Sequence, residues 1–155
     1  MTAVHLVRHA KAKNRLKWED SDHLRPLANR GRREAAAIAV RLADEPVSRL
    51  VSSPYVRCVQ TLEPLSDTLG LAIESSDLLA EGADGDDALA FLVSLAAAGT
   101  VACTHGDVLY DVVWLVAQSG VPLDGPLVVP VASTWVLAVE DERVVSARFI
   151  EQPPR

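Results

Sequence analysis

The sequence predicts an α/β fold, a three-layer α/β/α sandwich built on a mostly parallel central sheet. Short apolar runs rich in β-branched residues alternate along the chain with segments of helical periodicity, which is typical of parallel strands connected by helices. The 155 residues, of which 49% are hydrophobic and 23% are charged, are enough to form one buried core. We therefore expect a single domain over residues 1–155.

The first element is expected to be a buried strand at residues 4–7, because an apolar run stops there at a polar Arg-His pair. Residues 11–30 are polar and lack periodicity, which indicates a loop long enough to have a function of its own. Apolar residues at helical spacing then predict a helix over residues 31–43. Further strands are expected at residues 47–51, 71–75, 100–104, 134–139 and 144–150. The last two, joined by an acidic turn, are expected to form a hairpin at an edge of the sheet.

The other helices follow the second, third and fourth predicted strands. Ser53 as N-cap and Pro54 at the first helical position predict the start of the second helix. Pro64 should kink or split this helix, since proline lacks the N–H that a helix interior uses. Two more helices are predicted at residues 86–98 and around residues 108–116, each with one apolar face. Helices in all these connections would cover both faces of the sheet.

Charge is distributed unevenly along the chain. Residues 1–60 contain 12 Lys and Arg against 6 Asp and Glu, whereas residues 61–155 contain 3 against 15. The formal net charge is −6, and a globally acidic protein repels polyanions, so we expect no stable binding to nucleic acid. The basic N-terminal part can nevertheless attract a small anion into one cleft.

The sequence gives no reason to expect a membrane location. The uncharged run at residues 125–139 contains two prolines and is shorter than the roughly 18 apolar residues that a membrane helix needs. The first residues lack the pattern of a signal peptide, so we expect the protein in the cytoplasm. Cys58 and Cys103 are accordingly expected to be free thiols.

Polar residues stand at the ends of three predicted strands. Arg8 and His9 end the first strand, residues 52–53 end the second and lead to Arg57, and His105 ends the fourth. Ligands collect outside the carboxyl ends of strands in open α/β sheets, so these side chains should converge if the strands are parallel neighbours. Arginine matches phosphate oxygens with its planar fork, and histidine can attack or donate near neutral pH. The pattern predicts a site for phosphoryl groups.

Five short motifs over residues 3–120 stand in an order and spacing typical of one enzyme family. They are Val7-Arg8-His9-Ala10, Arg25-Pro26-Leu27 with Gly31, Ser52-Ser53-Pro54-Tyr55-Val56-Arg57 with Gln60-Thr61, Leu79-Ala80-Glu81, and Thr104-His105-Gly106. The set resembles the histidine phosphatase superfamily, also called phosphoglycerate mutase-like, and within it the compact SixA-type phosphohistidine phosphatases.

The resemblance implies a role for each of these polar residues. His9 would be the nucleophile and would carry a phosphoryl group before water regenerates it. Arg8, Arg57 and His105 would bind the phosphoryl oxygens and neutralise charge in the transition state, so that neither a metal nor a cofactor is required. Glu81 would give the leaving group its proton. Nearby alternatives as proton donors are Asp84, Asp86, Asp87 and Asp107.

The substrate stays open at this point. The chain lacks the long insertion that covers the active site in the mutases, and an open site favours hydrolysis over transfer. Lys11, Lys13 and Trp18 are candidate substrate-binding residues, and their loop also resembles the phosphatase domain appended to certain Nudix hydrolases. Trp18 would either stack on a base or anchor its own loop. A phosphohistidine protein, a nucleotide and a phosphorylated small molecule all remain candidates, and the alternative is a non-catalytic phosphoryl-binding or protein-interaction module that retains the cationic pocket.

Overall fold

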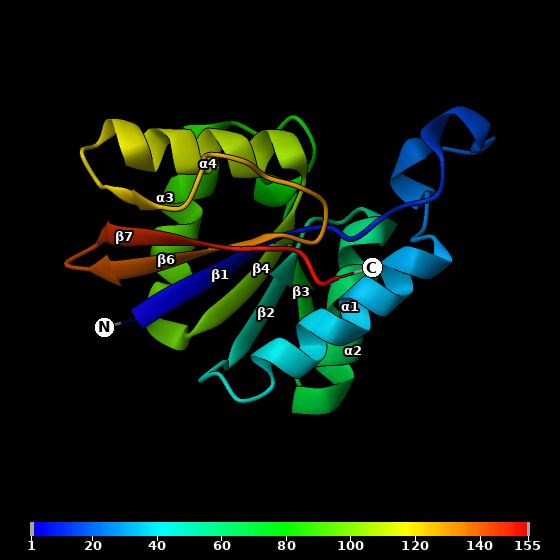
Figure 1. The fold of residues 1–155 in the computed structure, drawn as a ribbon, viewed down its shortest axis with the longest axis horizontal. Helices are drawn as coiled ribbons and strands as arrows, with labels where there is room; N and C mark the ends of the chain where they lie inside the picture. The colour runs from blue at the N-terminus through cyan, green and yellow to red at the C-terminus, as the bar shows by residue number, and fades with distance from the viewer. Residues whose placement is uncertain (1, 155) are drawn as a thin grey trace.

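One seven-stranded sheet organises residues 2–154, the part of the chain that the computed structural model describes (Figure 1). Its strands stand in the order β3-β2-β4-β1-β6-β7-β5, and β6 alone among them runs against the others, so the expected mostly parallel sheet is confirmed. The strands are β1 (Thr2–Arg8), β2 (Arg49–Ser52), β3 (Ile73–Ser75), β4 (Thr100–Thr104), β5 (Leu123–Asp124), β6 (Thr134–Glu140) and β7 (Arg143–Ile150).

Helices cover both faces of this sheet, which completes the predicted three layers (Figure 1). Helices α1 (Asn29–Leu42) and α2 (Val56–Leu69) lie on one face, and α3 (Gly85–Leu95) and α4 (Gly106–Gln118) lie on the other. Each helix buries the apolar stripe that its spacing predicts, as α1 does with residues 35, 38, 39 and 42.

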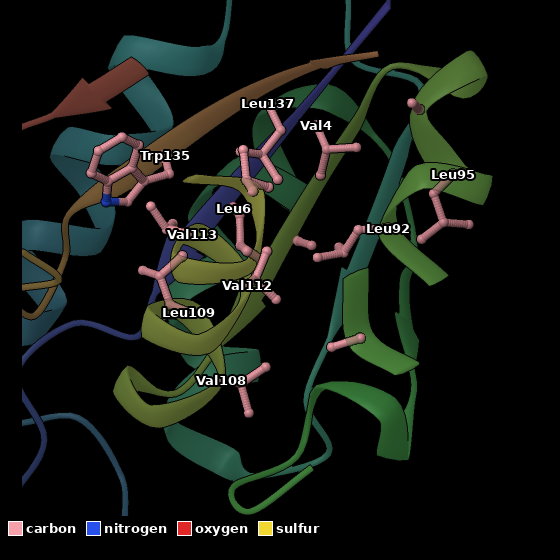
Figure 2. Close-up of a cluster of buried hydrophobic side chains, with 14 of the residues drawn as sticks. Val4, Leu6, Leu92, Leu95, Val108, Leu109, Val112, Val113, Trp135 and Leu137 are labelled. Atoms are coloured by element: carbon pink, nitrogen blue, oxygen red, sulfur yellow. The ribbon is translucent and has the colours of Figure 1, made fainter. Parts of the chain in front are cut away.

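The alternation of side chains along β1 separates two hydrophobic cores. Val4 and Leu6 pack with α3 and α4, in the cluster that Figure 2 shows together with Trp135, whereas Val7 packs with α1 and α2. Burial of both faces explains why β1 is a nearly continuous apolar run. The central strands therefore have fixed positions, and so do the residues that follow their ends.

The start of α2 differs from the prediction. The helix begins at Val56 with Tyr55 at the cap position, so Ser53 and Pro54 precede it. The Ser53 hydroxyl accepts a hydrogen bond from the Tyr55 N–H at 3.2 Å and also bonds to the side chain of His105, directly after β4, which removes it from helix capping. We expected Pro64 to kink or split this helix. The split is wrong, because α2 continues through Pro64 to Leu69.

Other boundaries shift by a few residues. Helix α1 begins at Asn29, and the loop before it contains two short 3-10 helices, Arg15–Lys17 and Asp22–Leu24. Helix α3 ends at Leu95 and continues as the 3-10 helix Ala96–Ala98. The two-residue strand β5, which was not predicted, pairs with β7 and takes the sheet edge that we expected the hairpin to hold.

The β6–β7 hairpin itself is confirmed, and its acidic turn has an unusual backbone. Asp141 and Glu142 have φ angles of 50° and 62°, as the two central residues of a type I′ hairpin turn require.

Among the described residues, none of the helices is both long and apolar enough for a membrane crossing.

Candidate active site

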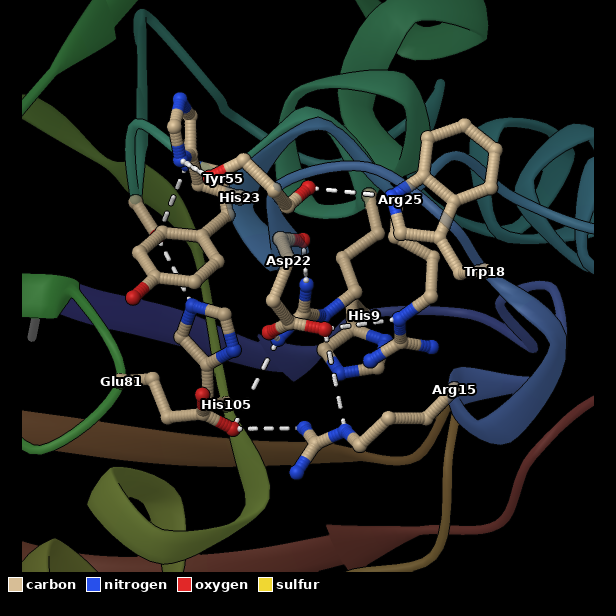
Figure 3. Close-up of polar contacts among 12 residues, drawn as sticks. His9, Arg15, Trp18, Asp22, His23, Arg25, Tyr55, Glu81 and His105 are labelled. Atoms are coloured by element: carbon tan, nitrogen blue, oxygen red, sulfur yellow. Dashed lines mark hydrogen bonds and ion pairs between the residues drawn. The ribbon is translucent and has the colours of Figure 1, made fainter.

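The ends of β2, β4 and β1 meet at one edge of the sheet. These strands are parallel neighbours, and their register places Arg8 opposite Thr104 and Ser52 opposite Cys103. The next residues, His9 and His105, therefore leave the sheet at the same level, and their ring centroids are 5.4 Å apart (Figure 3). Their convergence follows directly from the register.

His9 is buried and held in one tautomer. Its Nδ1 lies 2.8 Å from the carbonyl oxygen of Ala10, and because a carbonyl only accepts, Nδ1 carries the hydrogen and Nε2 keeps a free lone pair. Burial is the main cause that lowers the pKa of His9 to about 3; the hydrogen bond to Ala10 opposes it, and the charges of His105, Arg57 and Arg8 lower the pKa further. Burial is therefore a larger cause than the neighbouring guanidinium groups. His9 is neutral at physiological pH, as a nucleophile must be.

His105 has one nitrogen engaged and one free. Its Nε2 lies 2.8 Å from the Ser53 hydroxyl and 3.5 Å from the Cys58 sulfur, and its ring meets the edge of Tyr55 at 4.7 Å between centroids. The ring is 1% exposed, yet Nδ1 has no hydrogen-bond partner within residues 2–154. Contacts on one side fix the ring and leave the other nitrogen available for a ligand.

Arg8 lies flat against the first turn of α4. Its Nη1 donates to the carbonyl oxygen of Val129 at 2.8 Å, and a Cβ added at Gly106 would be 2.8 Å from its Cζ. Glycine is needed at position 106 for this close approach. Burial lowers the pKa of Arg8 from its usual value, opposed by the charge of Asp107, and the Nε atom is buried without a partner among the described residues.

Arg57 is fully buried and already bound to carboxylates. Its Nη1 donates to the backbone carbonyl of Asp22 at 2.9 Å, its Nη2 donates to Asp22 Oδ2 at 3.1 Å, and Glu81 Oε1 lies 3.6 Å from Nη2. Its Cζ lies 4.9 Å from the centre of the Tyr55 ring. The residue neighbours His9, as predicted, but two of its nitrogens hold protein oxygens.

Asp22 and Glu81 form one network with three arginines, of which Arg15 and Arg57 pair with both carboxylates and Arg25 pairs with Asp22 (Figure 3). Arg25 donates to Asp22 Oδ1 at 2.9 Å, and Arg15 donates to Glu81 Oε1 at 3.1 Å. Partial burial by itself would raise the pKa of Asp22, but the hydrogen bond from Arg25 and the charges of Arg57, Arg25 and Arg15 prevail and lower it. Asp22 is thus an anion surrounded by guanidinium groups.

A cleft of about 700 Å³ opens above these residues. Basic side chains dominate its walls, with two carboxylates and a short apolar side. Its lining includes Arg8, His9, Lys11, Lys13, Arg15, Arg25, Glu81, His105, Asp107, Val129 and Val131. The predicted substrate contacts Lys11 and Lys13 are among them, whereas Arg57 and Trp18 are not.

Trp18 lies in the loop over the site. Its indole Nε1 donates to the carbonyl oxygen of Ser21 at 3.0 Å, which anchors the loop to itself. This contact corresponds to the second of the two roles considered for Trp18, which is to anchor its own loop.

Within residues 2–154, no three histidine, cysteine or acidic side chains gather as metal ligands do.

Sequence reasoning missed several functional neighbours. Asp22, Arg25, Ser53 and Tyr55 all contact the site; Asp22 alone lies outside the five sequence motifs, and none of the four was given a site role. Asp22 precedes Arg25 by three residues, which is a spacing that allows an ion pair within one turn. That spacing was the available signal, although it does not reveal the bond to Arg57.

Three buried nitrogens at this edge share one property. Arg8 Nε, Arg57 Nε and His105 Nδ1 have no hydrogen-bond partner in the described part of the chain. An unsatisfied buried donor costs about 1–3 kcal/mol, so an arrangement of three is expected where a ligand completes the bonds. Guanidinium groups around a neutral imidazole suit a tetrahedral oxyanion with a phosphorus centre.

Comparison with known proteins agrees with this arrangement. The model of the histidine phosphatase superfamily (branch 1) matches residues 4–89. An 8-oxo-(d)GTP phosphatase of Mycolicibacterium smegmatis is 33% identical over 97% of this chain, which spans about half (48%) of that relative's length.

Solved structures show the same fold. A protein histidine phosphatase SixA complexed with tungstate has a TM-score of 0.74 at 26% identity, covering 97% of this chain and 95% of that one. A mycobacterial glucosyl-3-phosphoglycerate phosphatase has a TM-score of 0.70 at 14% identity, with 96% of both chains covered. At this low identity the second similarity concerns the fold alone.

Proposed function

Because the chain belongs to the histidine phosphatase superfamily (branch 1) and has the compact SixA-type fold, we propose that it hydrolyses a phosphomonoester, a phosphoramidate or a nucleotide phosphate through a phosphohistidine on His9. One observation carries the proposal. The neutral, buried His9 stands beside three nitrogens, on Arg8, Arg57 and His105, that lack hydrogen-bond partners in the described chain.

In the first step, the Nε2 lone pair of His9 attacks phosphorus in line with the leaving group. A P–N bond forms as the bond from phosphorus to the leaving oxygen or nitrogen breaks. Arg8, Arg57 and His105 donate to the equatorial oxygens, where negative charge is spread in the transition state. The two guanidinium groups supply the charge neutralisation that a divalent metal gives in kinases, so the mechanism requires no metal.

The leaving group takes a proton in the same step, and Glu81 is our proposed donor. Its carboxylate reaches the cleft from the loop after β3 and is held by Arg15 and Arg57 when no substrate is present. It must leave these partners and take up a proton before it acts as an acid. Asp107, the alternative, accepts a hydrogen bond from the Gly82 N–H at 2.8 Å.

In the second step, water attacks the phosphohistidine. The P–N bond breaks, His9 recovers its lone pair and inorganic phosphate leaves. Glu81, now ionised, accepts the proton of the attacking water, as microscopic reversibility requires of a group that acted as an acid. The cleft is open, so water reaches the intermediate without a large rearrangement.

The cleft is larger than a phosphate group and has further basic residues. Lys11 and Lys13 lie on its wall, and we propose that they contact anionic parts of the substrate beyond the transferred phosphoryl group. The relatives act on protein phosphohistidine, on 8-oxo-(d)GTP and on glucosyl-3-phosphoglycerate, as their names state. All three substrate classes are therefore to be compared side by side.

The test is hydrolysis of p-nitrophenyl phosphate in the presence of EDTA. We expect turnover by the unmodified protein, loss of at least about 10³-fold in His9→Ala, and little change in the matched control His23→Ala, whose side chain is exposed in the loop. Inorganic phosphate and vanadate should compete with the substrate. No turnover by the unmodified protein together with intact phosphate binding would support the non-catalytic binding module instead, and undiminished activity of His9→Ala would exclude the mechanism.

A further inference from the structure

The segment 14–25 forms a cover over Arg57. It carries Asp22, whose backbone carbonyl and carboxylate both accept hydrogen bonds from the Arg57 guanidinium group at 2.9 and 3.1 Å. Arg57 is 0% exposed and does not line the cleft, although Arg8, His9 and His105 do. Asp22 therefore occupies a hydrogen bond on each Nη atom of Arg57 that a phosphoryl group in the cleft would otherwise use.

The oxygens on Arg57 occupy the donors that an oxyanion would use. Its Nη2 donates to Asp22 Oδ2 and also lies 3.6 Å from Glu81 Oε1, so this nitrogen is paired with two carboxylates. Only Nε is buried without a partner in the described chain. Arg57 therefore has one nitrogen without a partner, one bonded to a backbone carbonyl and one paired with carboxylates. Carboxylates are the protein groups most similar to phosphate in charge and geometry.

We propose that the Asp22 carboxylate is an internal anion that holds Arg57 in the unliganded protein and is displaced when a phosphoryl group binds, so that segment 14–25 acts as a lid. The inference rests on the proposed function, because it assumes that Arg57 binds the phosphoryl oxygens. It adds that substrate binding is a competition between two anions for one guanidinium group. A phosphoryl dianion has more charge and three oxygens, so it should prevail over a carboxylate.

The attachment of the segment favours such a movement. Its two ends are tied to each other, since Lys13 N donates to the Pro26 carbonyl at 2.9 Å and Arg25 Nη1 donates to the Lys13 carbonyl at 2.8 Å. This closed base is typical of Ω-loops, compact surface loops that are packed by their own side chains and are frequently functional. Leu16 near the tip is 94% exposed.

The tip is held to the rest of the protein by contacts that can be exchanged. Besides the Asp22–Arg57 bonds, these are the ion pair of Arg15 with Glu81 and the edge contact of His23 with Tyr55 at 6.3 Å between centroids. Exposed or half-exposed ion pairs contribute little each, about 0–1 kcal/mol. Opening would therefore cost little outside the Arg57 bonds, which the ligand replaces.

The first test is phosphate affinity, measured by calorimetry with inorganic phosphate and no turnover. Asp22→Asn should bind phosphate about three- to tenfold more tightly, because the competing charge is gone. The matched control is Asp20→Asn, which removes a carboxylate from the same segment that has no bond to Arg57. Unchanged or weaker binding by Asp22→Asn, or equal tightening in the control, would overturn the proposal.

The second test uses Trp18 as a reporter of the lid. A Trp114→Phe background removes the half-exposed tryptophan and leaves Trp18 and the buried Trp135. Phosphate should change the Trp18 emission of this protein, and the Asp22→Asn variant without phosphate should already resemble the bound state. An unchanged spectrum on saturation with phosphate would contradict a moving lid.

The two hypotheses fail in different ways. If the protein hydrolyses p-nitrophenyl phosphate but Asp22→Asn binds phosphate no better, the lid is wrong and the phosphatase proposal stands. If the unmodified protein neither hydrolyses the ester nor binds phosphate, the proposed function fails and the lid with it. A fall in kcat of Asp22→Asn with unchanged phosphate affinity would make Asp22 a positioning residue for Arg57 and would also overturn displacement.

Discussion

The cleft has a floor of strand-end residues, Arg8, His9 and His105, and a rim formed by segment 14–25 and Glu81. The floor residues follow β1 and β4, whose register sets their positions, and both imidazoles are nearly inaccessible to solvent. The rim is held by ion pairs between partly exposed side chains. The difference suggests a division of work in which the floor performs phosphoryl transfer and the rim controls which anion reaches it.

The largest expected effect concerns the floor. His105→Ala should lower kcat/KM for p-nitrophenyl phosphate about 10²–10³-fold, since it removes a donor aimed at the phosphoryl oxygens. Far-UV circular dichroism and the unfolding midpoint check that the variant folds. A loss of less than threefold in a folded protein would show that His105 does not bind the phosphoryl oxygens.

A smaller effect is expected at the rim. Glu81→Gln should lower kcat/KM for phenyl phosphate about 10–100-fold, because its poor leaving group needs a proton. The loss for p-nitrophenyl phosphate should be smaller, because that leaving group departs more readily unprotonated. Equal losses for both esters would contradict the role of Glu81 as the acid, and Asp107→Asn would then be the variant to compare.

His9, in the floor, should also make the free energy of unfolding depend on pH. The pKa of His9 falls to about 3 on folding from an ordinary value of 6.5, so between these values the unfolded chain binds more protons than the folded one. Protonation of this histidine therefore does not affect the free energy of unfolding above about pH 6.5. As the pH falls from 6.5 toward 3, it lowers the free energy of unfolding by up to about 1.4 kcal/mol per pH unit. Urea unfolding at pH 6 and pH 5 should show a steeper loss in the unmodified protein than in His9→Gln. Parallel pH profiles would mean that His9 is not held neutral.

The smallest effect is expected at the tip of the rim. Leu16 is almost fully exposed and makes no contact that the proposed mechanism uses. Leu16→Ser should change the free energy of unfolding by less than about 0.5 kcal/mol and kcat/KM by less than about twofold. A larger loss of activity would mean that the tip of the segment meets the substrate.

The same comparison explains what the sequence could predict. The floor was predictable because Arg8-His9 and His105 stand at the ends of predicted strands, and parallel pairing of neighbouring strands brings such positions together. The rim was not predictable, because the bonds of Asp22 depend on where an aperiodic segment settles against α2, 35 residues later in the chain. No local pattern contains that information.

Ser53 shows what a local sequence pattern cannot predict. Its position before a proline and a helix is typical of an N-cap, and local chemistry alone supports that assignment. In the folded protein its hydroxyl bonds to His105, a residue 52 positions away, and the helix starts later. A long-range hydrogen bond to a buried ring outweighs a cap that solvent or backbone can replace.

The most direct test of the phosphoryl-transfer floor is to trap the intermediate. The protein is mixed with a radiolabelled phosphate ester, quenched in base, digested and mapped, and the phosphohistidine isomer is assigned by phosphorus NMR. We predict label on His9 at Nε2, because Nδ1 is committed to the carbonyl oxygen of Ala10. Label on His105, on Cys58 or on Nδ1 of His9, or hydrolysis with no labelled histidine at any time point, would contradict the account.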